Sequence, residues 1–346
     1  MFRHDAESAG HPFGIRRVCR DTPDEGWPSL EESDFTKAKN VVLPNTLLSF
    51  GGNPFVGCLS LETVEVESGG MYKTRDNMLL SVDETELVAV YGKRSFSRTA
   101  LTIPETVERM GSFALFNSEK LKSVTIPKNV REIQGNPFVW CCALESVTID
   151  PENQWFKMVN NCLVSMDGKL LIGLNGPNVT HGSSKNPRHV VVPDGVEGVG
   201  ELSLTADMVN LRTIWLPPTV TDVYDALEWG TEDAVYFTAT NRFVVHGEIF
   251  CDTNIKDAYF YGPVPDGFLD WNARWWDCGK VKTIHYTAEF ADEWRDALKQ
   301  IGQKGALFDP ADFLSPYDSR HDSELAASYG PFVPGERVSL ALPALA

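Results

Sequence analysis

The chain has 346 residues, 42% of them hydrophobic and 23% charged, which is the balance of a folded globular protein rather than a disordered or fibrous one. Its 48 acidic side chains outnumber the 31 basic ones and give a formal net charge of -17. A surface of this sign repels phosphate groups, so nucleic acid is not an expected partner. No continuous apolar run is long enough to cross a bilayer, so we expect no membrane insertion.

Residues 1–36 contain acidic side chains, histidines and prolines but no continuous apolar core, and we expect them to form an acidic arm. Because a secretory signal needs such a core, the sequence favours a cytoplasmic location. The seven cysteines are an odd number and show neither CxxC nor Cys/His ligand spacing. We therefore expect reduced thiols, no disulfide framework and no metal site.

A repeated triplet, in which two apolar residues flank any third residue, runs through most of the chain. Most consecutive triplets start about 23 residues apart, and two gaps are longer. The triplets are 41–43, 64–66, 101–103, 124–126, 147–149, 190–192, 214–216, 235–237, 258–260 and 284–286. In a β-strand the flanking residues face inward and the middle one outward, and a following proline ends the strand. Units this short bury apolar surface only by stacking, which predicts a solenoid.

The most regular units share a longer pattern, I-P-x-x-V-x-x-I followed by F-x-x-C-x-x-L-x-x-V-x-I. One such unit runs from Ile126 through Phe138 and Cys141 to Ile149. In addition, the segment GNPFVGC that ends at Cys58 returns as GNPFVWC, ending at Cys141. This pattern resembles the BspA-like leucine-rich repeat.

The resemblance covers residues 37–302 and implies a leucine-rich-repeat solenoid, mostly β and counted as α/β by the convention of that family. The repeats are regular over 37–216 and degenerate over 217–286, where the Phe-x-x-Cys step is lost. Residues 287–302 have the 3.6-residue apolar period of a helix and end at a glycine, so we expect a capping helix there. Residues 303–346 show little periodicity and are expected to form a C-terminal tail.

The two long gaps between triplets hold similar insertions. Asn77–Asp83 matches Asn161–Asp167, and each has alternating apolar residues next to an acidic turn. Such alternation is typical of β-hairpins, so we expect two inserted hairpins.

The register of the repeat also predicts which side chains are buried, because surface residues have no reason to recur in step. We expect a core at Phe55, Leu61, Leu121, Ile126, Phe138, Leu144 and Ile149.

No sequence motif of a known catalytic site occurs, so we expect no enzyme and no cofactor. An alternative is a carbohydrate-binding or carbohydrate-active protein that uses the aromatic and acidic region 215–286. That alternative would need two carboxylates to converge, and the candidates are Glu248, Asp252, Asp270 and Asp277, with His246 near them in the sequence. Trp271, Trp275 and Trp276 could either pack beneath the capping helix or form a platform for a partner.

The middle residues of the triplets form an outward row that becomes aromatic toward the C-terminus. The predicted partner-binding residues are Trp215, Tyr236, Tyr259, His285, Glu65, Thr125 and Thr148. Large aromatic side chains that point outward at strand spacing are usually covered, either by a partner or by the protein's own segments. The sequence leaves both outcomes open.

BspA-like repeats occur in bacterial cell-surface and host-contact proteins, so the resemblance implies adhesion or protein interaction and a cell-surface or exported location. We therefore expect a scaffold whose solenoid face binds a protein, with a glycan as the alternative ligand. A further alternative is a structural subunit of a larger assembly.

Overall fold

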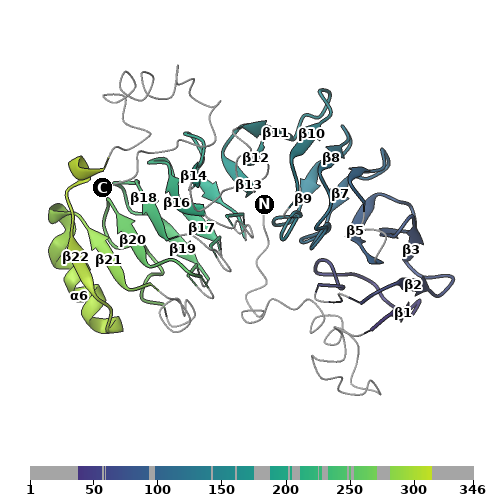
Figure 1. Ribbon diagram of the computed structural model, residues 1–346, viewed down its shortest axis with the longest axis horizontal. Helices are drawn as coiled ribbons and strands as arrows, with labels where there is room; N and C mark the ends of the chain where they lie inside the picture. The colour runs from purple at the N-terminus through teal and green to yellow at the C-terminus, as the bar shows by residue number, and fades with distance from the viewer. Residues whose placement is uncertain are drawn as a thin grey trace. The chain divides into compact units, whose positions relative to one another are not determined.

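The computed structural model describes residues 38–56, 58, 60–92, 98–141, 143–159, 162–174, 188–201, 203–204, 211–224, 226–227, 233–247, 249–250, 253–270 and 281–313. These residues form two compact units. Unit 1 takes the described residues up to Ala143 together with Asp150–Asn153. Unit 2 takes Leu144–Ile149 and the described residues from Gln154 onward. Both can be followed in Figure 1.

The predicted triplets lie on, or directly at the end of, short strands. In unit 1 these are β1 (Asn40–Leu43), β2 (Thr63–Val66), β6 (Ala100–Thr102) and β8 (Ser123–Ile126). In unit 2 they are β10 (Ser146–Ile149), β14 (Arg188–Val191), β16 (Leu211–Leu216), β18 (Ala234–Phe237), β20 (Asp257–Phe260) and β21 (Thr283–Tyr286). β1 pairs with β2, and β6 with β8, in parallel. The order β14-β16-β18-β20-β21-β22, with β22 at Gly305–Leu307, makes one parallel sheet in unit 2.

A second sheet in each unit begins with the predicted hairpin and continues with short strands from the V-x-x-I step. In unit 1 it contains β3 (Tyr72–Arg75), β4 (Met78–Ser81), β5 (Glu86–Val90), β7 (Arg109–Met110) and β9 (Glu132–Ile133). In unit 2 it contains β11 (Phe156–Val159), β12 (Cys162–Ser165), β13 (Leu170–Leu174), β15 (Gly198–Val199), β17 (Asp222–Tyr224) and β19 (Val244–His246). The first three strands of each are antiparallel and the rest are parallel. Both inserted hairpins are thus confirmed, and each has one more strand than the sequence indicated.

The two hairpins share one turn geometry. Ser81 Oγ donates to Asp83 Oδ1 over 2.7 Å, and the backbone N–H of Thr85 donates to the same oxygen over 3.1 Å. In unit 2, Ser165 Oγ donates to Asp167 Oδ1 over 2.6 Å, and the backbone N–H of Lys169 donates to the same oxygen over 3.0 Å. These bonds stabilise the ionised carboxylate, so the pKa of Asp83 falls to about 2.

The predicted core is buried at six of its seven positions: Phe55, Leu61, Leu121, Ile126, Phe138 and Leu144. Ile149 is only half-buried. Its strand, β10, is followed in the chain by a hairpin rather than by another triplet, so the regular step that would cover Ile149 is missing. The described cysteines Cys58, Cys141 and Cys162 are buried and form no disulfide. Burial raises the pKa of Cys58 to about 11, which keeps its thiol neutral.

The predicted capping helix is confirmed. A short 3-10 turn, Ala288–Phe290, leads into α6 (Ala291–Ile301), which ends at Gly302 with φ 68°. Glycine adopts that left-handed conformation most readily, because it has no Cβ. Trp294 of α6 is fully buried, and its indole N–H donates to the carbonyl of Gly262 over 3.0 Å. Among the described residues, no helix is both long and apolar enough to span a membrane.

Candidate functional site

Four of the predicted partner-binding residues form a continuous stack on the parallel sheet of unit 2. The register aligns Trp215 with Tyr236, Tyr236 with Tyr259, and Tyr259 with His285. Neighbouring ring centroids are 3.8, 4.4 and 4.2 Å apart, and the planes differ by at most 8°. Parallel strands lie about 4.8 Å apart, which is close to the separation at which flat rings pack. We call Trp215, Tyr236, Tyr259 and His285 the aromatic stack.

Three rings of the aromatic stack belong to a small apolar cluster that is separate from the main core of unit 2. The cluster contains Val191, Trp215, Ala234, Tyr236 and Tyr261, with Tyr259, Phe308 and Phe313 packed against it. The main core instead uses the inward residues of the same strands, such as Ile214, Val235 and Ile284. The stack therefore lies on the outward side of the sheet, as predicted.

The sequence left open what covers these rings, and the structure answers this for two of them. Trp215 is 1% exposed and Tyr236 is 4% exposed, so neither is accessible in this conformation. Tyr259 and His285 are half-buried. The stack is therefore covered by the chain itself at one end and partly accessible at the other.

Part of this cover, over Tyr236 and Tyr259, comes from the segment Gly305–Phe313, which we call the C-terminal strap. Its first residues form β22, which lies beside β21 in Figure 1, and the N–H of Phe308 donates to the carbonyl of Tyr286 over 3.1 Å. Asp309 then accepts a hydrogen bond from the N–H of Ala311 over 2.9 Å and turns the chain through the 3-10 helix Pro310–Asp312. The parallel sheet thus continues beyond α6 into residues 303–346, which the sequence predicted to be a C-terminal tail.

Two rings of the C-terminal strap lie against the aromatic stack. Phe308 contacts Tyr259 and Tyr261 with centroids 5.4 and 5.2 Å apart. Phe313 contacts Tyr236 and Tyr259 at 5.5 and 5.0 Å. Most of these contacts are edge-on, which suits the quadrupoles of aromatic rings.

The tyrosines under the strap are neutral donors. Burial raises the pKa values of Tyr236, Tyr259 and Tyr261, and nearby Asp257 adds to the effect at the first two. Tyr236 and Tyr259 share a hydrogen bond between their hydroxyls. The hydroxyl of Tyr261 is buried, and no described residue gives it a hydrogen-bond partner.

A histidine pairs with an aspartate on each sheet of unit 2. His285 Nε2 lies 2.9 Å from Asp257 Oδ1, and His246 Nε2 lies 3.0 Å from Asp222 Oδ1. Each histidine also stacks on a tyrosine of the preceding strand, with Tyr224 4.2 Å from His246. The sequence pointed to His246 but not to its partner, because strand register and not sequence distance brings the pair together.

The described carboxylates of this region lie on separate elements. Asp222 and Asp257 belong to different sheets, and Asp270 is exposed in a loop. Glu248, Asp252, Asp277 and the tryptophans Trp271, Trp275 and Trp276 lie outside the described residues. Among the residues that are described, no group of three or more His, Cys, Asp or Glu side chains is placed to hold a metal ion.

The polar members of the predicted binding set do not join the stack. Glu65 is exposed on β2, and Thr125 is half-buried on β8, both in unit 1. Thr148 is exposed on β10, which lies outside the six-stranded sheet of unit 2. The structure thus brings four of the seven predicted residues into one surface.

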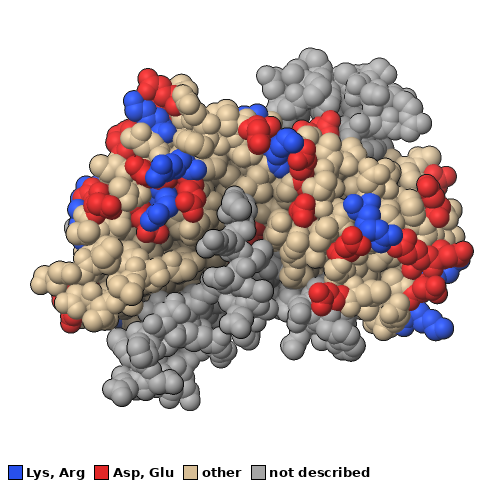
Figure 2. All heavy atoms as spheres, turned by 180° about the vertical axis from the view of Figure 1, so that it is seen from behind, with Lys and Arg blue, Asp and Glu red and all other residues tan. Residues whose placement is uncertain are grey.

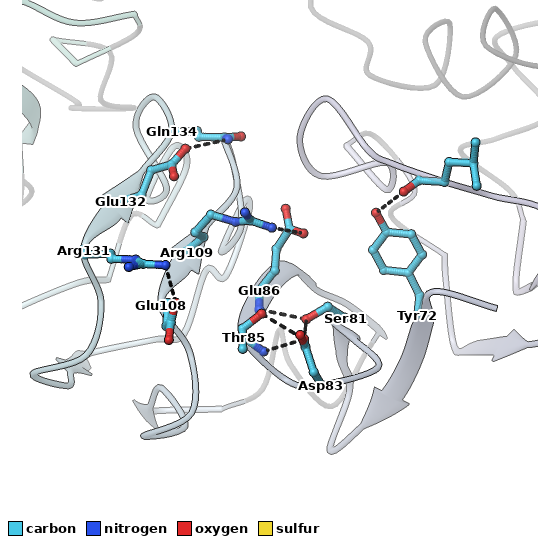
Figure 3. Close-up of polar contacts among 11 residues, drawn as sticks. Tyr72, Ser81, Asp83, Thr85, Glu86, Glu108, Arg109, Arg131, Glu132 and Gln134 are labelled. Carbon is cyan, nitrogen blue, oxygen red and sulfur yellow. Dashed lines mark hydrogen bonds and ion pairs between the residues drawn. The ribbon is translucent and has the colours of Figure 1, made fainter. Parts of the chain in front are cut away.

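A second outward row, which the sequence reasoning missed, lies on the second sheet of unit 1. Glu86, Arg109 and Glu132 occupy aligned positions on β5, β7 and β9. Arg109 Nη2 lies 3.2 Å from Glu86 Oε2, and Gln134 donates to Glu132 over 3.0 Å (Figure 3). The charged residue just before the last position of the V-x-x-I step, Arg109 in one repeat and Glu132 in the next, could have revealed it. We call Glu86, Arg109 and Glu132 the charged row.

Another ion pair also joins neighbouring repeats of unit 1. Arg131 lies 2.6 Å from Glu108 on the neighbouring repeat (Figure 3). On the face shown in Figure 2, basic side chains stand beside acidic ones and do not gather into a broad basic patch. The described part of this face shows no continuous basic surface of the kind that binds a phosphate backbone.

The comparisons agree with this architecture of stacked short repeats. Residues 29–89 and 89–165 match the family model of the BspA type leucine rich repeat region, in six copies. The chain therefore contains BspA-type leucine-rich repeats, as predicted. None of the curated proteins matches it.

Three solved structures resemble the chain at low identity. A leucine-rich repeat protein from Eubacterium ventriosum is 16% identical, with 72% of this chain and 73% of that one covered and a TM-score of 0.40. A leucine rich cell surface protein from Faecalibacterium prausnitzii is 16% identical, with coverage of 78% and 79% and a TM-score of 0.38. The pneumococcal vaccine antigen PcpA is 14% identical, with coverage of 79% and 68% and a TM-score of 0.36.

Proposed function

We propose that the chain is a non-catalytic protein-interaction module that binds a protein partner through the outward face of β20 and β21. The aromatic stack is the single observation that carries the proposal. Its rings lie on the side of the sheet away from the main core, so the solenoid does not need them for its own interior. Rigid aromatic side chains bring much apolar area to an interface at little cost in conformational entropy.

The accessible end of the stack is the place where a partner would begin to bind. Tyr259 and His285 are half-buried there, and Asp257 holds the His285 ring through its Nε2 atom. A fixed imidazole next to a tyrosine offers an apolar surface together with polar atoms at its edge. A cell-surface or exported location would suit this role, because BspA-type repeats are common in cell-surface proteins.

The test is to pan a library of random peptides on the immobilised full chain and to measure affinities of the enriched peptides. His285→Ala should weaken binding roughly tenfold or more, as expected for a hot-spot residue. Thr148→Ala is the matched control, because Thr148 is an exposed triplet residue outside the stack, and it should bind like the unchanged chain. Peptides that lose affinity only with Arg109→Gln would instead place the interaction on the charged row.

A glycan is the second candidate ligand, and one arrangement favours it. Tyr224 and His246 form a flat stacked platform beside Asp222, and the His246 and Asp222 side chains are 36% and 35% exposed. Sugars bind to flat rings next to carboxylates. Measuring the same chain on a glycan array, with Tyr224→Ala as the variant, separates the two candidates.

A further inference from the structure

The C-terminal strap occupies the aromatic stack in the way that a bound peptide would. It adds a three-residue strand to the edge of the sheet and then lays two rings, Phe308 and Phe313, on Tyr236, Tyr259 and Tyr261. Strand addition followed by side-chain anchoring is a recurring mode of peptide recognition. The strap therefore shows what kind of ligand this face accepts.

The strap is attached by few buried groups. Leu307 is 54% exposed, although its aligned neighbour on β21, Tyr286, is 5% exposed. Residues 309–312 are exposed, and the two phenylalanines are only half-buried. Segments with this little buried surface open at lower free energy than the core of a domain.

The strap also leaves one buried polar group of this face without a described hydrogen-bond partner. The Tyr261 side chain is nine-tenths buried beside Phe308, and its hydroxyl has no hydrogen-bond partner among the described residues. A phenyl ring offers no strong acceptor to that hydroxyl. A ligand that places a carbonyl or hydroxyl oxygen there would make a bond that the strap does not make.

We propose that the face formed by Tyr236, Tyr259 and Tyr261 is a binding site for an extended peptide segment of a protein partner. This segment carries two aromatic side chains five residues apart and an oxygen acceptor between them, and it displaces the C-terminal strap when it binds. The inference rests on the proposed function and adds the class of ligand and the competition with the strap.

The first test uses the strap sequence itself as the probe. A fluorescent peptide Leu-Phe-Asp-Pro-Ala-Asp-Phe, corresponding to residues 307–313, is titrated into the full chain and into the full-length double variant Phe308→Ala/Phe313→Ala. The double variant should bind the peptide at least about tenfold more tightly than the unchanged chain, because its own rings no longer compete. A peptide with both phenylalanines replaced by alanine is the control and should bind neither protein.

A second variant guards against loss of folding in the first. A Cβ at Gly305 would come within 2.5 Å of Leu298 Cδ1 and 2.6 Å of Tyr286 Cε1, so Gly305→Val should push β22 off the sheet while both phenylalanines remain. It too should bind the peptide more tightly than the unchanged chain. Thermal melts of both variants report whether unit 2 stays folded.

The outcomes separate the inference from the proposed function. Equal or absent binding of the peptide by folded variants and the unchanged chain would overturn the displaceable strap. Tight binding by the variants supports it even if the random library yields no ligand, and in that case only the proposed function fails. Enriched library peptides without paired aromatic residues would contradict the ligand class.

Discussion

The aromatic stack of unit 2 and the charged row of unit 1 are built by the same geometry with different residues. In both, parallel strands place outward side chains of successive repeats at aligned positions. In unit 2 those positions hold flat rings that stack on one another. In unit 1 they hold Glu86, Arg109 and Glu132, whose charges alternate in sign. The comparison shows that the repeat fixes where the side chains stand, and the residue chosen decides what the surface does.

The energetic consequences of the two rows differ in a predictable way. Aligned like charges would repel, so a polar row is stable only when the signs alternate, and its exposed pairs contribute little. Aligned rings remove apolar area from water and require a cover, which the C-terminal strap supplies at Tyr236 and Tyr259. Mutations in the two rows should therefore have effects of different size.

Truncation of the covered end of the stack should have the largest effect. Tyr236→Ala removes a ring that is 4% exposed and contacts Trp215, Tyr259 and Phe313, so we expect a loss of roughly 3–5 kcal/mol in the free energy of unfolding. Chemical denaturation of the full chain measures it. A loss below about 1 kcal/mol would show that the stack is not held as the structure has it. The sequence left open whether this ring meets a partner or is covered by the chain itself, and its burial is the reason to expect a loss of stability.

Removal of a single oxygen from the same cluster should act in the opposite direction. Tyr261→Phe deletes a buried hydroxyl that no described residue satisfies, so stability should stay unchanged or rise by about 1 kcal/mol. The matched change Tyr259→Phe removes a hydroxyl that is bonded to Tyr236, and it should lower stability. If Tyr261→Phe were the more damaging of the two in thermal melts, its hydroxyl must have a partner.

The charged row should respond weakly. Arg109→Gln breaks the exposed pair with Glu86, and we expect a loss of about 1 kcal/mol or less that shrinks as salt is added. Denaturation at low and high ionic strength checks this. A salt-independent loss comparable to that of Tyr236→Ala would remove the distinction between the two rows.

The smallest effect should come from the turn between β4 and β5 in the second sheet of unit 1. Asp83 has a pKa lowered to about 2, so its hydrogen bonds stabilise the folded chain above the ordinary carboxyl pKa near 4. That stability is lost as the pH falls from there through about 2. Asp83→Asn should therefore have a lower melting temperature than the unchanged chain at pH 6. The two melting temperatures should converge near pH 2. A difference that grows toward low pH would exclude this assignment.

Strands with a strong periodic pattern could be predicted from the sequence, and those without one could not. The triplets, the two hairpins and α6 all repeat an apolar spacing that only one structure satisfies. β3 was not predicted, because Tyr72-Lys73-Thr74-Arg75 has no alternation of apolar residues. This segment forms a strand by pairing with β4. Trp271, Trp275 and Trp276 lie outside the described residues.

The candidate site was predictable in position but not in accessibility. Spacing alone placed Trp215, Tyr236, Tyr259 and His285 above one another. The cover depends on Phe308 and Phe313, two residues in a segment with no periodicity, which find their place only through the edge of β21. The pairs His285–Asp257 and His246–Asp222 could not be predicted from the sequence either, because they join residues on different repeats.

The position of β22 at the end of the sheet has a consequence for how unit 2 comes apart. Repeat arrays fray from their ends, because a terminal repeat has a neighbour on one side only. Since β22 is both the outermost strand and the start of the C-terminal strap, fraying there also uncovers Tyr236 and Tyr259. Amide protons of β22 should then exchange with solvent well before those of β18. Mild warming or low denaturant would uncover the aromatic face while the rest of unit 2 remains folded.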